Sequence, residues 1–483
     1  MSYNAYITFL KDIRKHPNAD RLFLANAAGY TVIVDQNTTE NDLGIFFPSD
    51  GKLSEEMLYN NNLYRHKKKN LDPDKVGFFD DNGKVQHIKL RGIVSEGFWA
   101  PVSCLSWTGT NLEKIKEGDQ FDKLNGKTIC QKFVTKATLR EIQRNKTKKK
   151  HIKLTNRFPN FAKHFETEQL RTNIKIIPKG AIVSLSFKCH GSSGRTSYSL
   201  SYSPNWYEKI WNNFVDISER SIFYLLTKID RKILRNIPII RNIPIIRSLW
   251  KDFSNKVEIL FHNNIKQVRG SIEKYAYVTG TRNVTMNPDD IKDTYYSGKQ
   301  FRSIIHNMLK EKGLRKGETI YYEIVGYDEV GVPIMGTYST SKDKEIEKKY
   351  GDQIVFSYGC NKEIPDECFK ILVYRITNTS SEGFHYDLPL YELINRCRQL
   401  YLEIVPQAVS PFVYENPEQL LKICQEYSDG ADVLDNRHPR EGVVIRIEHS
   451  DYFKFLKYKG ETFCILEGIM KNDPKYIDTE EIS

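Results

Sequence analysis

Charged side chains interrupt several apolar, β-branched stretches of the chain, and this pattern limits the possible fold more than any other feature. The stretch AIVSLSFKCHGSSGR is an apolar strand that runs into a polar turn at Lys188. ETIYYEIVGYD places Glu323 within an aromatic strand, where a carboxylate is costly to bury unless it is paired or binds something. REGVVIRIE has Glu441 at the start of another strand. These segments predict β-sheets that carry charged groups at a site.

A fourth segment, DYFKFLKYKG, is a strand with three lysines. Because side chains alternate along a strand, Lys457 and Lys459 share one face and Lys454 takes the other. Two ammonium groups on one face repel each other unless an anion lies between or above them. In order along the chain, the four segments carry a lysine, two glutamates and a lysine pair. This combination would suit a nucleotide held over a sheet, with carboxylates for ribose hydroxyls and a hydrated divalent metal.

Length and charge bound the architecture and the partner. A chain of 483 residues is too long for one ordinary core and suits two or three domains. Its formal net charge of +11 favours a polyanion, most often nucleic acid, as the partner, although a merely basic surface is the alternative.

The expected compartment is intracellular, either cytoplasmic or in a virus-encoded setting. The eight scattered cysteines contain no CxxC pair and form no zinc set with histidines, which is typical of a reducing compartment. The N-terminus lacks the features of a signal peptide, and no apolar run reaches the roughly 18 residues of a membrane span. We therefore expect a soluble protein, as a monomer.

The pattern of segments predicts an α+β multidomain chain. Residues 1–105 read as short strands separated by turns, which indicates a small barrel. Residues 106–180 form a connector with the basic run KTKKKHIK, which is either a solvated surface or a nucleic-acid contact. From about 181 to 483 the β character returns, and the charged strands lie there.

An insertion at about 205–268 interrupts the last module. Its apolar residues recur at helical spacings, and it contains the hexapeptide RNIPII twice, which is too few copies for a solenoid. We expect a mostly helical insertion with a proline-broken middle. It is either packed on its own domain, or it serves as a membrane-surface or partner-docking element because it is basic and aromatic.

The charged segments together resemble the motifs of covalent nucleotidyltransferases, which are the polynucleotide ligases and mRNA capping enzymes. A KxHG form of the first motif resembles RNA ligases rather than DNA ligases. The matching segments are KCHG with Lys188, TGTRNV with Arg282, YYEIVG with Glu323, LVYRIT with Tyr374, EGVVIR with Glu441, and LKYK with Lys457 and Lys459.

The N-terminal module carries a second resemblance. HPNADRL and RGIVSEGFWAP, in this order, are similar to tRNA-binding OB-fold modules and to the N-terminal OB-like module of one RNA ligase family. Two features depart from the ligase pattern: Phe187 stands where a glutamate usually precedes the motif lysine, and the insertion separates the first motif from Arg282.

The resemblance implies an ATP-dependent RNA ligase: an OB-like module, then a nucleotidyltransferase module of antiparallel sheets with flanking helices. It implies ATP and Mg²⁺ or Mn²⁺ as cofactors, and RNA as the partner, as a nicked duplex or an RNA–DNA hybrid. The implied roles are nucleophile for Lys188, ribose contact for Glu323, adenine stacking for Tyr374, metal binding for Glu441, α-phosphate contact for Lys457 and Lys459, and phosphate or ribose contact for Arg195 and Arg282.

Two alternatives stay open at this point. A capping-type guanylyltransferase shares the lysine chemistry but uses GTP, and its OB module usually follows the catalytic module rather than preceding it. A non-enzymatic protein that binds tRNA or another RNA would use the N-terminal module alone, and the ordered set of charged strands argues against it.

Overall fold

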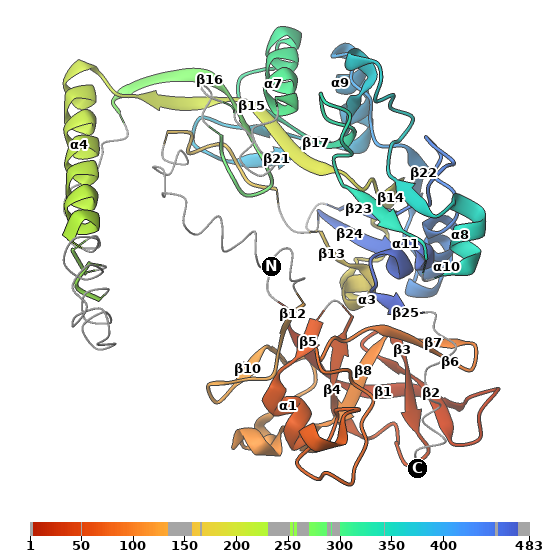
Figure 1. The fold of residues 1–483 in the computed structure, drawn as a ribbon. Coiled ribbons are helices and arrows are strands. Elements are labelled where there is room, and N and C mark those ends of the chain that lie inside the picture. Colours follow the sequence, from red (N-terminus) through yellow and green to blue (C-terminus); the bar gives the residue numbers. More distant parts are fainter. Residues whose placement is uncertain are drawn as a thin grey trace.

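A computed structural model describes most of the chain, as an N-terminal module and a larger C-terminal module (Figure 1). The α+β class with mostly antiparallel sheets, expected from the sequence, is confirmed. The basic run at 146–153 and the RNIPII repeat at 235–246 lie outside the described residues. The structure describes residues 3–49, 51–133, 157–164, 167–229, 252–254, 256–257, 270–286, 291, 300–341, 343–449 and 453–471.

A six-stranded antiparallel sheet forms the N-terminal module and curls into a barrel-like shape. The backbone N–H of Thr31 donates to the Glu96 carboxylate at 2.8 Å, and that of Ile33 donates to Ser95 Oγ at 3.1 Å, which brings the two ends of the sheet together. Across the sheet the strands are β3 (Tyr30–Asp35), β2 (Leu22–Ala27), β1 (Ala5–Lys15), β4 (Leu43–Pro48) and β8 (Gly97–Pro101), with β9 (Gln120–Phe121) also beside β1.

Strand β4 separates two hydrophobic cores of this module. Phe46 and Phe47 are both fully buried, because successive side chains of a strand point to opposite faces. Phe46 packs inside the curled sheet with Trp99 and Leu10. Phe47 packs on the outer face against a cluster that includes Met57 from helix α1 (Glu55–Asn60).

The N-terminal module continues beyond the boundary at residue 105 expected from the sequence. β9 pairs with β1, and β12 (Cys130–Lys132) pairs with β5 (Gly51–Leu53). Strands up to Lys132 therefore complete this module. The remaining short strands here are β6 (His87–Leu90), β7 (Ile93–Ser95), β10 (Lys123–Leu124) and β11 (Lys127–Thr128).

Two five-stranded sheets build the C-terminal module. In the first, the strands β24, β23, β14 and β22 are antiparallel to their neighbours, and β13 is parallel to β24. Helices α3 (Leu170–Asn173) and α10 (Pro417–Ser428) cover one face and contribute Leu170, Leu420 and Cys424 to its core. The strand bounds are β13 (Glu168–Gln169), β24 (Lys454–Lys459), β23 (Gly442–Glu448), β14 (Ile182–Phe187) and β22 (Gln407–Val413).

The second sheet is antiparallel throughout and is covered on one face by helices α7 (Phe301–Lys312) and α9 (Leu390–Gln399). The even-numbered residues of its central strand, Ile320, Tyr322 and Ile324, face these helices. The odd-numbered residues therefore face the other way. The strands in order are β16 (Ile272–Gly280), β15 (Ser192–Ser203), β17 (Glu318–Gly326), β20 (Phe369–Thr379) and β21 (His385–Asp387).

Smaller elements close the space beside these sheets. They pack a further core around Cys189, Phe356, Tyr358 and Phe463. The eight cysteines, all within the described part of the chain, are buried free thiols. The smaller elements are β18 (Thr337–Ser339), α8 (Lys344–Tyr350), β19 (Gln353–Val355) and α11 (Glu461–Leu466).

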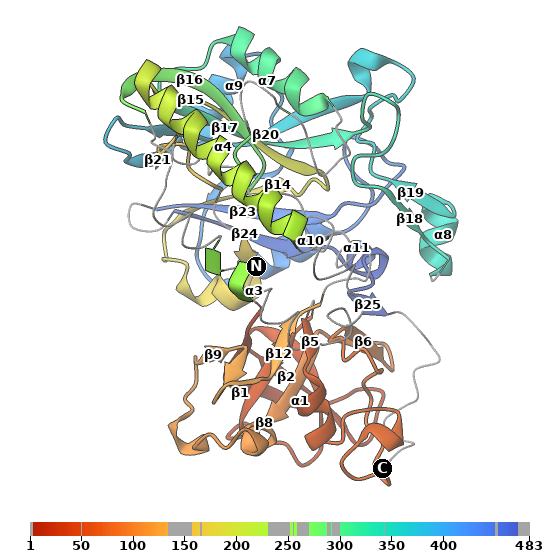
Figure 2. The same cartoon turned by 60° about the vertical axis from the view of Figure 1, so that its left-hand side comes forward.

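The insertion leaves the second sheet at the end of the β15–β16 hairpin. Ser203 and Ile272 form the last paired position of that hairpin, and helix α4 (Trp206–Ile229) begins just beyond it. Figures 1 and 2 show α4 as a long helix that stands beside the C-terminal module. Among the described residues, no helix is long and apolar enough to cross a bilayer.

Contacts from both ends of the C-terminal module hold the N-terminal module. Strand β25 (Met470–Lys471) pairs in parallel with β6. The carbonyl oxygen of Gly468 accepts hydrogen bonds from Lys84 Nζ at 2.5 Å and Gln86 Nε2 at 2.8 Å. On α3, Arg171 forms an ion pair with Glu96 of the barrel at 2.7 Å.

A buried ion pair supplies a test of the C-terminal module. Glu318 receives two hydrogen bonds from Arg396, at 2.7 and 2.8 Å, and both residues are buried. Replacing Arg396 by Met leaves a buried carboxylate without its partner, so we expect Arg396→Met to lower the free energy of unfolding of this module by about 3–5 kcal/mol.

Urea unfolding followed by circular dichroism measures the change. Arg398→Met is the matched control, because Arg398 is exposed on the same helix, and it should change stability by less than about 0.5 kcal/mol. Equal effects of the two substitutions would contradict the role given to the ion pair.

Candidate active site

Lys188 and Glu441 meet where two neighbouring antiparallel strands begin and end. Lys188 directly follows β14, and Glu441 directly precedes β23. The backbone N–H of Lys188 donates to the Gly442 carbonyl at 2.9 Å, and Lys188 Nζ lies 2.8 Å from Glu441 Oε1. Gly442 has a φ of +143°, and a Cβ there would lie 2.2 Å from the carbonyl oxygen of Tyr458. Glycine is therefore required for β24 to approach this closely.

Glu441 is a buried carboxylate with unused capacity. Burial alone would raise its pKa, but Lys188 and His190 outweigh burial and hold the pKa of Glu441 well below its ordinary value. Its Oε2 atom lies 3.6 Å from His190 Nδ1 and accepts no hydrogen bond from any described residue. An ionised, buried oxygen of this kind is suited to a cation or to a water bound to one.

His190 is enclosed by aromatic rings beneath the Lys188 turn. Its ring lies 4.8 Å from that of Phe356 and 4.9 Å from that of Phe463, measured between centroids. His190 Nε2 is 2.6 Å from the Tyr338 hydroxyl, and its backbone N–H donates to the Tyr358 hydroxyl at 2.5 Å. These contacts fix the turn that presents Lys188. Sequence reasoning gave His190 no role and did not find Tyr338 or Tyr358, which are far away in sequence.

Glu323 approaches the same turn from the second sheet. It is an odd-numbered residue of β17 and so lies on the face away from α7 and α9. A Cβ on Gly191 would lie 2.7 Å from the Glu323 side chain, so the turn and this side chain are in close contact. Burial, only partly offset by Lys188, raises the pKa of Glu323 to about 7. At neutral pH this carboxyl can therefore either donate or accept a hydrogen bond.

Tyr374 lies where the pairing of β17 with β20 changes register. Tyr321 pairs with Arg375, but Tyr322 pairs with Val373, so Tyr374 is the extra residue of a β-bulge. Its hydroxyl lies 3.1 Å from Ser193 Oγ, and burial raises its pKa. The bulge brings the ring to the same side as Glu323, whose charge contributes to that shift.

Two arginines approach Glu323, and only one was expected from the sequence. Arg282 follows β16, and its charge lowers the pKa values of both Glu323 and Tyr374. Arg302 on α7 was missed. It is buried, and it donates to Ser192 Oγ at 2.6 Å and to the Ser193 carbonyl at 3.2 Å. The only sequence signal for Arg302 is a charged residue on the apolar face of a helix.

Arg195 lies below the sheet surface rather than at an open position. Its side chain is 1% exposed, and it donates to the carbonyl oxygens of Thr281, Phe161 and Ala162. Its guanidinium lies 4.0 Å from the centroid of the Phe161 ring. Burial lowers its pKa to about 10, so it remains charged at neutral pH. These contacts join the segment before β13 to the loop that carries Arg282.

His164, which sequence reasoning did not find, lies beside Tyr374. The two ring centroids are 5.2 Å apart, and His164 Nδ1 is 3.2 Å from Arg375 Nη1. Burial and the nearby charge of Arg375 lower the pKa of His164 to about 3. The imidazole is therefore neutral at physiological pH.

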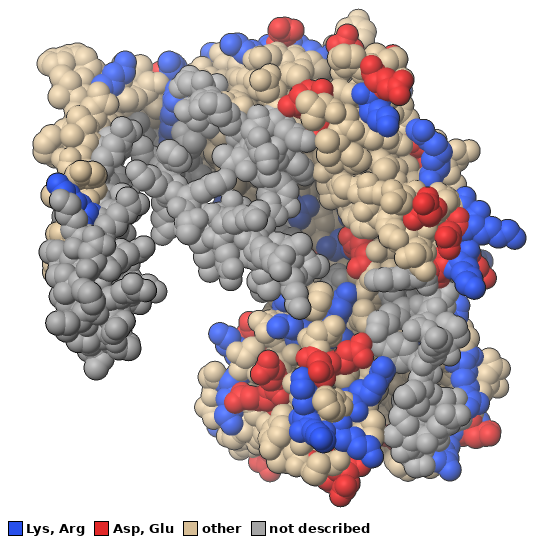
Figure 3. Space-filling view, in the orientation of Figure 1, with Lys and Arg blue, Asp and Glu red and all other residues tan. Residues whose placement is uncertain are grey.

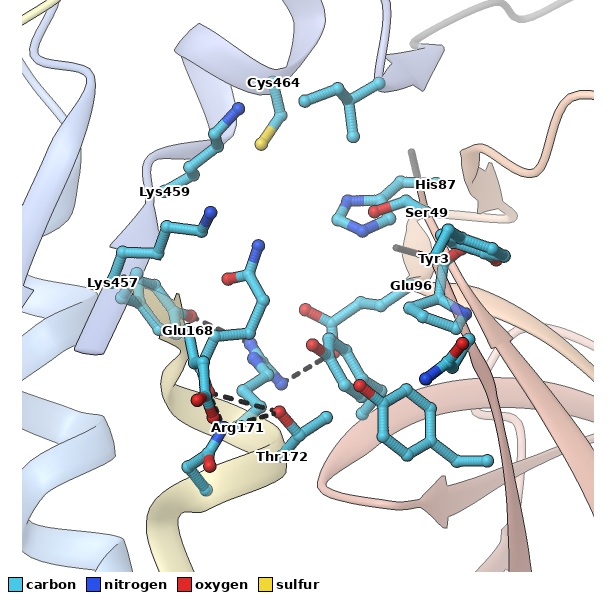
Figure 4. A pocket seen from close by; sticks show the side chains of 18 of the residues that line it. Tyr3, Ser49, His87, Glu96, Glu168, Arg171, Thr172, Lys457, Lys459 and Cys464 are labelled. Atoms are coloured by element: carbon cyan, nitrogen blue, oxygen red, sulfur yellow. Dashed lines mark hydrogen bonds and ion pairs between the residues drawn. The ribbon is translucent and has the colours of Figure 1, made fainter. Parts of the chain in front are cut away.

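Lys457 and Lys459 line a cavity of about 450 Å³ between the two modules (Figure 4). Lys459 pairs with Gly442 across the sheet, so it lies at the same sheet end as Lys188, and its charge helps to lower the pKa of Glu441. Lys459 Nζ also lies 2.5 Å from Glu467. Lys454, which alternation places on the other face, is 2.9 Å from Glu168.

The opposite wall of this cavity comes from the N-terminal module. Tyr3, Ser49, His87 and Glu96 line this wall across from the two lysines, and Arg171 and Thr172 of α3 also line the cavity (Figure 4). Figure 3 shows lysine and arginine surface at the hollow between the modules.

The donor set fits a hydrated divalent cation better than a fully coordinated one. Within the described residues, no three His, Cys, Asp or Glu side chains gather as a metal-binding group. Mg²⁺ commonly keeps several waters and takes one or two carboxylates together with substrate phosphates. Glu441, with its unused Oε2, meets that description, and Glu323 lies near it.

Comparisons with known proteins identify the fold. No protein family model and no curated protein sequence matches the chain. Among solved structures, an RNA ligase of Naegleria gruberi in its apo form has a TM-score of 0.51 and 14% identity, over 97% of this chain and 98% of that one. A variant of the same ligase with ATP and Mn gives 0.51 and 14% over 96% and 98%. A second variant with ATP and Mn gives 0.52 and 13% over 96% and 99%.

The chain therefore has the fold of this RNA ligase over almost its whole length. At 13–14% identity the likeness shows the architecture alone. The resemblance to RNA ligases that the motifs carry is confirmed at that level.

The buried neutral His164 predicts a specific sensitivity to acid. Its pKa is lowered in the folded state, so between about pH 6.5 and pH 3 the unfolded chain binds the extra proton and stability falls as the pH falls. By pH 5 we expect protonation of this histidine in the unfolded chain to lower the free energy of unfolding by about 1–2 kcal/mol. His164→Gln, which cannot be protonated, should lose less stability than the wild type between pH 7 and pH 5, measured by thermal unfolding.

His385→Gln is the control, because His385 is exposed and its pKa is lowered to a lesser degree. An identical loss of stability in the wild type and in His164→Gln would contradict the prediction.

Proposed function

We propose that the chain is an ATP-dependent RNA ligase that joins 3′-hydroxyl and 5′-phosphate RNA ends. The observation that carries this proposal is the cluster at the end of β14 and β23. There Lys188 lies 2.8 Å from Glu441. The charge of Lys459 helps to lower the pKa of Glu441, and the charge of Lys188 acts in the same direction on the pKa of Glu323. The fold shared with a known RNA ligase supports it.

In the first step, the amine of Lys188 attacks the α-phosphorus of ATP. A nitrogen–phosphorus bond forms, the bond from the α-phosphorus to the bridging oxygen breaks, and pyrophosphate leaves with that electron pair. The amine gives up its proton in this step, and the product is a lysyl-AMP phosphoramidate. Lys188 is suited to this role because it ends a strand, at a turn that only small residues and His190 follow.

Surrounding residues of the chain would hold the nucleotide. Glu323 binds the ribose hydroxyls, for which a carboxyl with a pKa of about 7 can accept or donate a hydrogen bond. Tyr374, presented by its bulge, stacks on the adenine. Lys457 and Lys459 neutralise the α-phosphate, and they line the cavity into which pyrophosphate would leave.

A divalent cation, Mg²⁺ or Mn²⁺, supplies charge neutralisation at the α-phosphate when bound. Glu441 would hold it, through water or directly, with its free Oε2. In the ion pair seen here Glu441 holds Lys188 in place. The same carboxylate therefore positions the amine and provides the cation site.

The two arginines of the predicted set take different places in this proposal. Arg282, beside Glu323 and Tyr374, is placed to contact ribose or phosphate. Arg195 is a weaker candidate for such a contact, because its side chain is buried and its Nε and Nη1 atoms already donate to the carbonyl oxygens of Thr281, Phe161 and Ala162. It supports the loop that carries Arg282.

In the second and third steps AMP moves to the RNA 5′-phosphate, and the 3′-hydroxyl then displaces it. We propose that the N-terminal module, as an OB-like fold, holds the polynucleotide, and that a single chain seals nicks in an RNA duplex or an RNA–DNA hybrid. The cavity between the modules supports this, since both modules contribute to its walls.

Labelling of the protein with radioactive ATP tests the first step. Lys188→Ala should abolish acid-stable label, because it removes the amine that we propose as the nucleophile, while sealing of a pre-adenylated RNA persists in part. Lys457→Ala and Lys459→Ala should suppress labelling, and Lys454→Ala, the matched control on the same strand, should not, because Lys454 is paired with Glu168. Label on the Lys188→Ala protein would mean that another lysine is the nucleophile, and a preference for GTP would indicate a capping-type enzyme.

Four nicked duplexes that differ only in the sugars beside the nick test the substrate. We expect sealing to require a ribonucleotide on the 3′-hydroxyl side, because a ribose offers a 2′-hydroxyl and A-like geometry. Loss of one buried hydrogen bond costs about 1–3 kcal/mol, which is roughly 5- to 150-fold in rate. Equal sealing of all four nicks, or preference for an all-DNA nick, would point to a DNA ligase instead.

A further inference from the structure

Helix α4 concentrates apolar surface that the proposed reaction does not use. Eight of the 25 exposed large apolar side chains in the described part of the chain lie on this one helix. The helix stands beside the C-terminal module rather than between its sheets (Figures 1 and 2).

Five of these side chains follow one face of the helix. At about 100° per residue, Trp206, Ile210, Phe214, Ile217 and Tyr224 fall within an arc of about 80°. They are well exposed, at 73%, 61%, 55%, 64% and 63%. We call these five residues the α4 stripe. The stripe runs along most of the 24-residue helix, which is about 36 Å long.

A different side of α4 is less exposed to solvent. Val215 is 4% exposed, and Ile222 and Leu226 are half-buried. These three lie within about 40° of one another, on a side adjacent to the stripe and separate from it. That side is therefore less exposed, whereas the stripe stays exposed.

The start of α4 is rigidly attached to the β15–β16 hairpin. Glu208 and Asn205 form a capping box, in which the Glu208 N–H donates to Asn205 Oδ1 at 3.0 Å and the Asn205 N–H donates to Glu208 Oε2 at 2.8 Å. Glu208 Oε2 also accepts from the N–H of Ser271, just before β16, at 3.1 Å. The stripe thus has a fixed origin on the sheet that carries Glu323.

The composition of the stripe and its surroundings favours one occupant. Ile210 and Ile217 offer no π face, so the stripe is poorly suited to stack nucleic-acid bases. Trp206 and Tyr224, at its two ends, are residue types enriched where lipid meets water. The next 40 residues of the sequence, 230–269, hold nine Lys or Arg against three Asp or Glu, which is more than half of the chain's net charge of +11.

We propose that the α4 stripe binds the surface of a bilayer that contains anionic lipids. The helix lies in the plane of the headgroups with the stripe inserted, and the basic charge of the insertion draws it to the anionic surface. The helix does not cross the bilayer, in agreement with the polar side chain of Asn212, which lies opposite the stripe, and that of Lys209 beside it.

Flotation of the full-length protein with vesicles tests this proposal. We expect binding to vesicles of phosphatidylcholine mixed with phosphatidylserine, weaker binding to phosphatidylcholine alone, and weakening by salt. Ile210→Ser, Phe214→Ser and Ile217→Ser combined should lower the partition coefficient about tenfold or more, because three inserted apolar side chains are lost.

The matched control combines Phe384→Ser, Tyr386→Ser and Tyr391→Ser, which are equally exposed apolar residues on other elements, and it should bind like the wild type. Labelling with ATP should be unchanged in both triple variants, which shows that they are folded. The absence of wild-type binding to anionic vesicles, or equal binding by the stripe variant, would overturn the proposal.

Two further measurements identify other occupants. If sedimentation velocity shows a dimer that the stripe variant abolishes, with no vesicle binding, the stripe is an interface between two copies of the chain. If the stripe variant instead loses affinity for RNA at physiological salt, the stripe is a nucleic-acid surface. Either result overturns the lipid assignment.

Discussion

The site depends on one contact, the ion pair between Lys188 and Glu441 at 2.8 Å. The pair forms because β14 ends where its antiparallel neighbour β23 begins, and Gly442 lets β24 come close enough to bring Lys459 to the same end. The chain then crosses from the first sheet to the second within the four residues after Phe187, which places Glu323 opposite the amine. A charged cluster of this kind is costly to bury unless a ligand of complementary charge completes it.

Arg171 couples this cluster to the N-terminal module. It forms an ion pair with Glu96 of the barrel at 2.7 Å, and its other terminal nitrogen donates to the Tyr458 hydroxyl at 2.8 Å. Tyr458 lies between Lys457 and Lys459 on β24. A shift of the barrel would therefore be transmitted to the strand that carries both lysines.

Sequence reasoning found the parts of the site that a strand pattern can reveal. Lys188, Glu323 and Glu441 are conspicuous because each is charged within or beside an apolar strand, and the alternation of β24 separates Lys454 from the lysine pair. Residues that reach the site from elsewhere gave no such signal: Arg302 comes from a helix, and Tyr338 and His164 come from short or irregular segments. Arg195 shows the opposite limit, since its position as the fourth residue of β15 is visible in the sequence, whereas its burial against three carbonyl oxygens is a tertiary property. The boundary of the first module was similarly hidden, because the strands between residues 120 and 132 are only two or three residues long.

The insertion and the site are joined through a single sheet. Strand β15 begins at Ser192, beside the Lys188 turn, and ends at Ser203, where the insertion starts. Its first residues pair with β17 at Glu323, and its last pair with β16 next to Ser271, which Glu208 of α4 holds. A surface that engages α4 would thus fix the orientation of this sheet, and with it the side of the molecule on which the cavity between the modules opens. Because the capping contacts lie at the end of the hairpin farthest from Lys188, α4 can be engaged without any displacement of the residues that surround the amine.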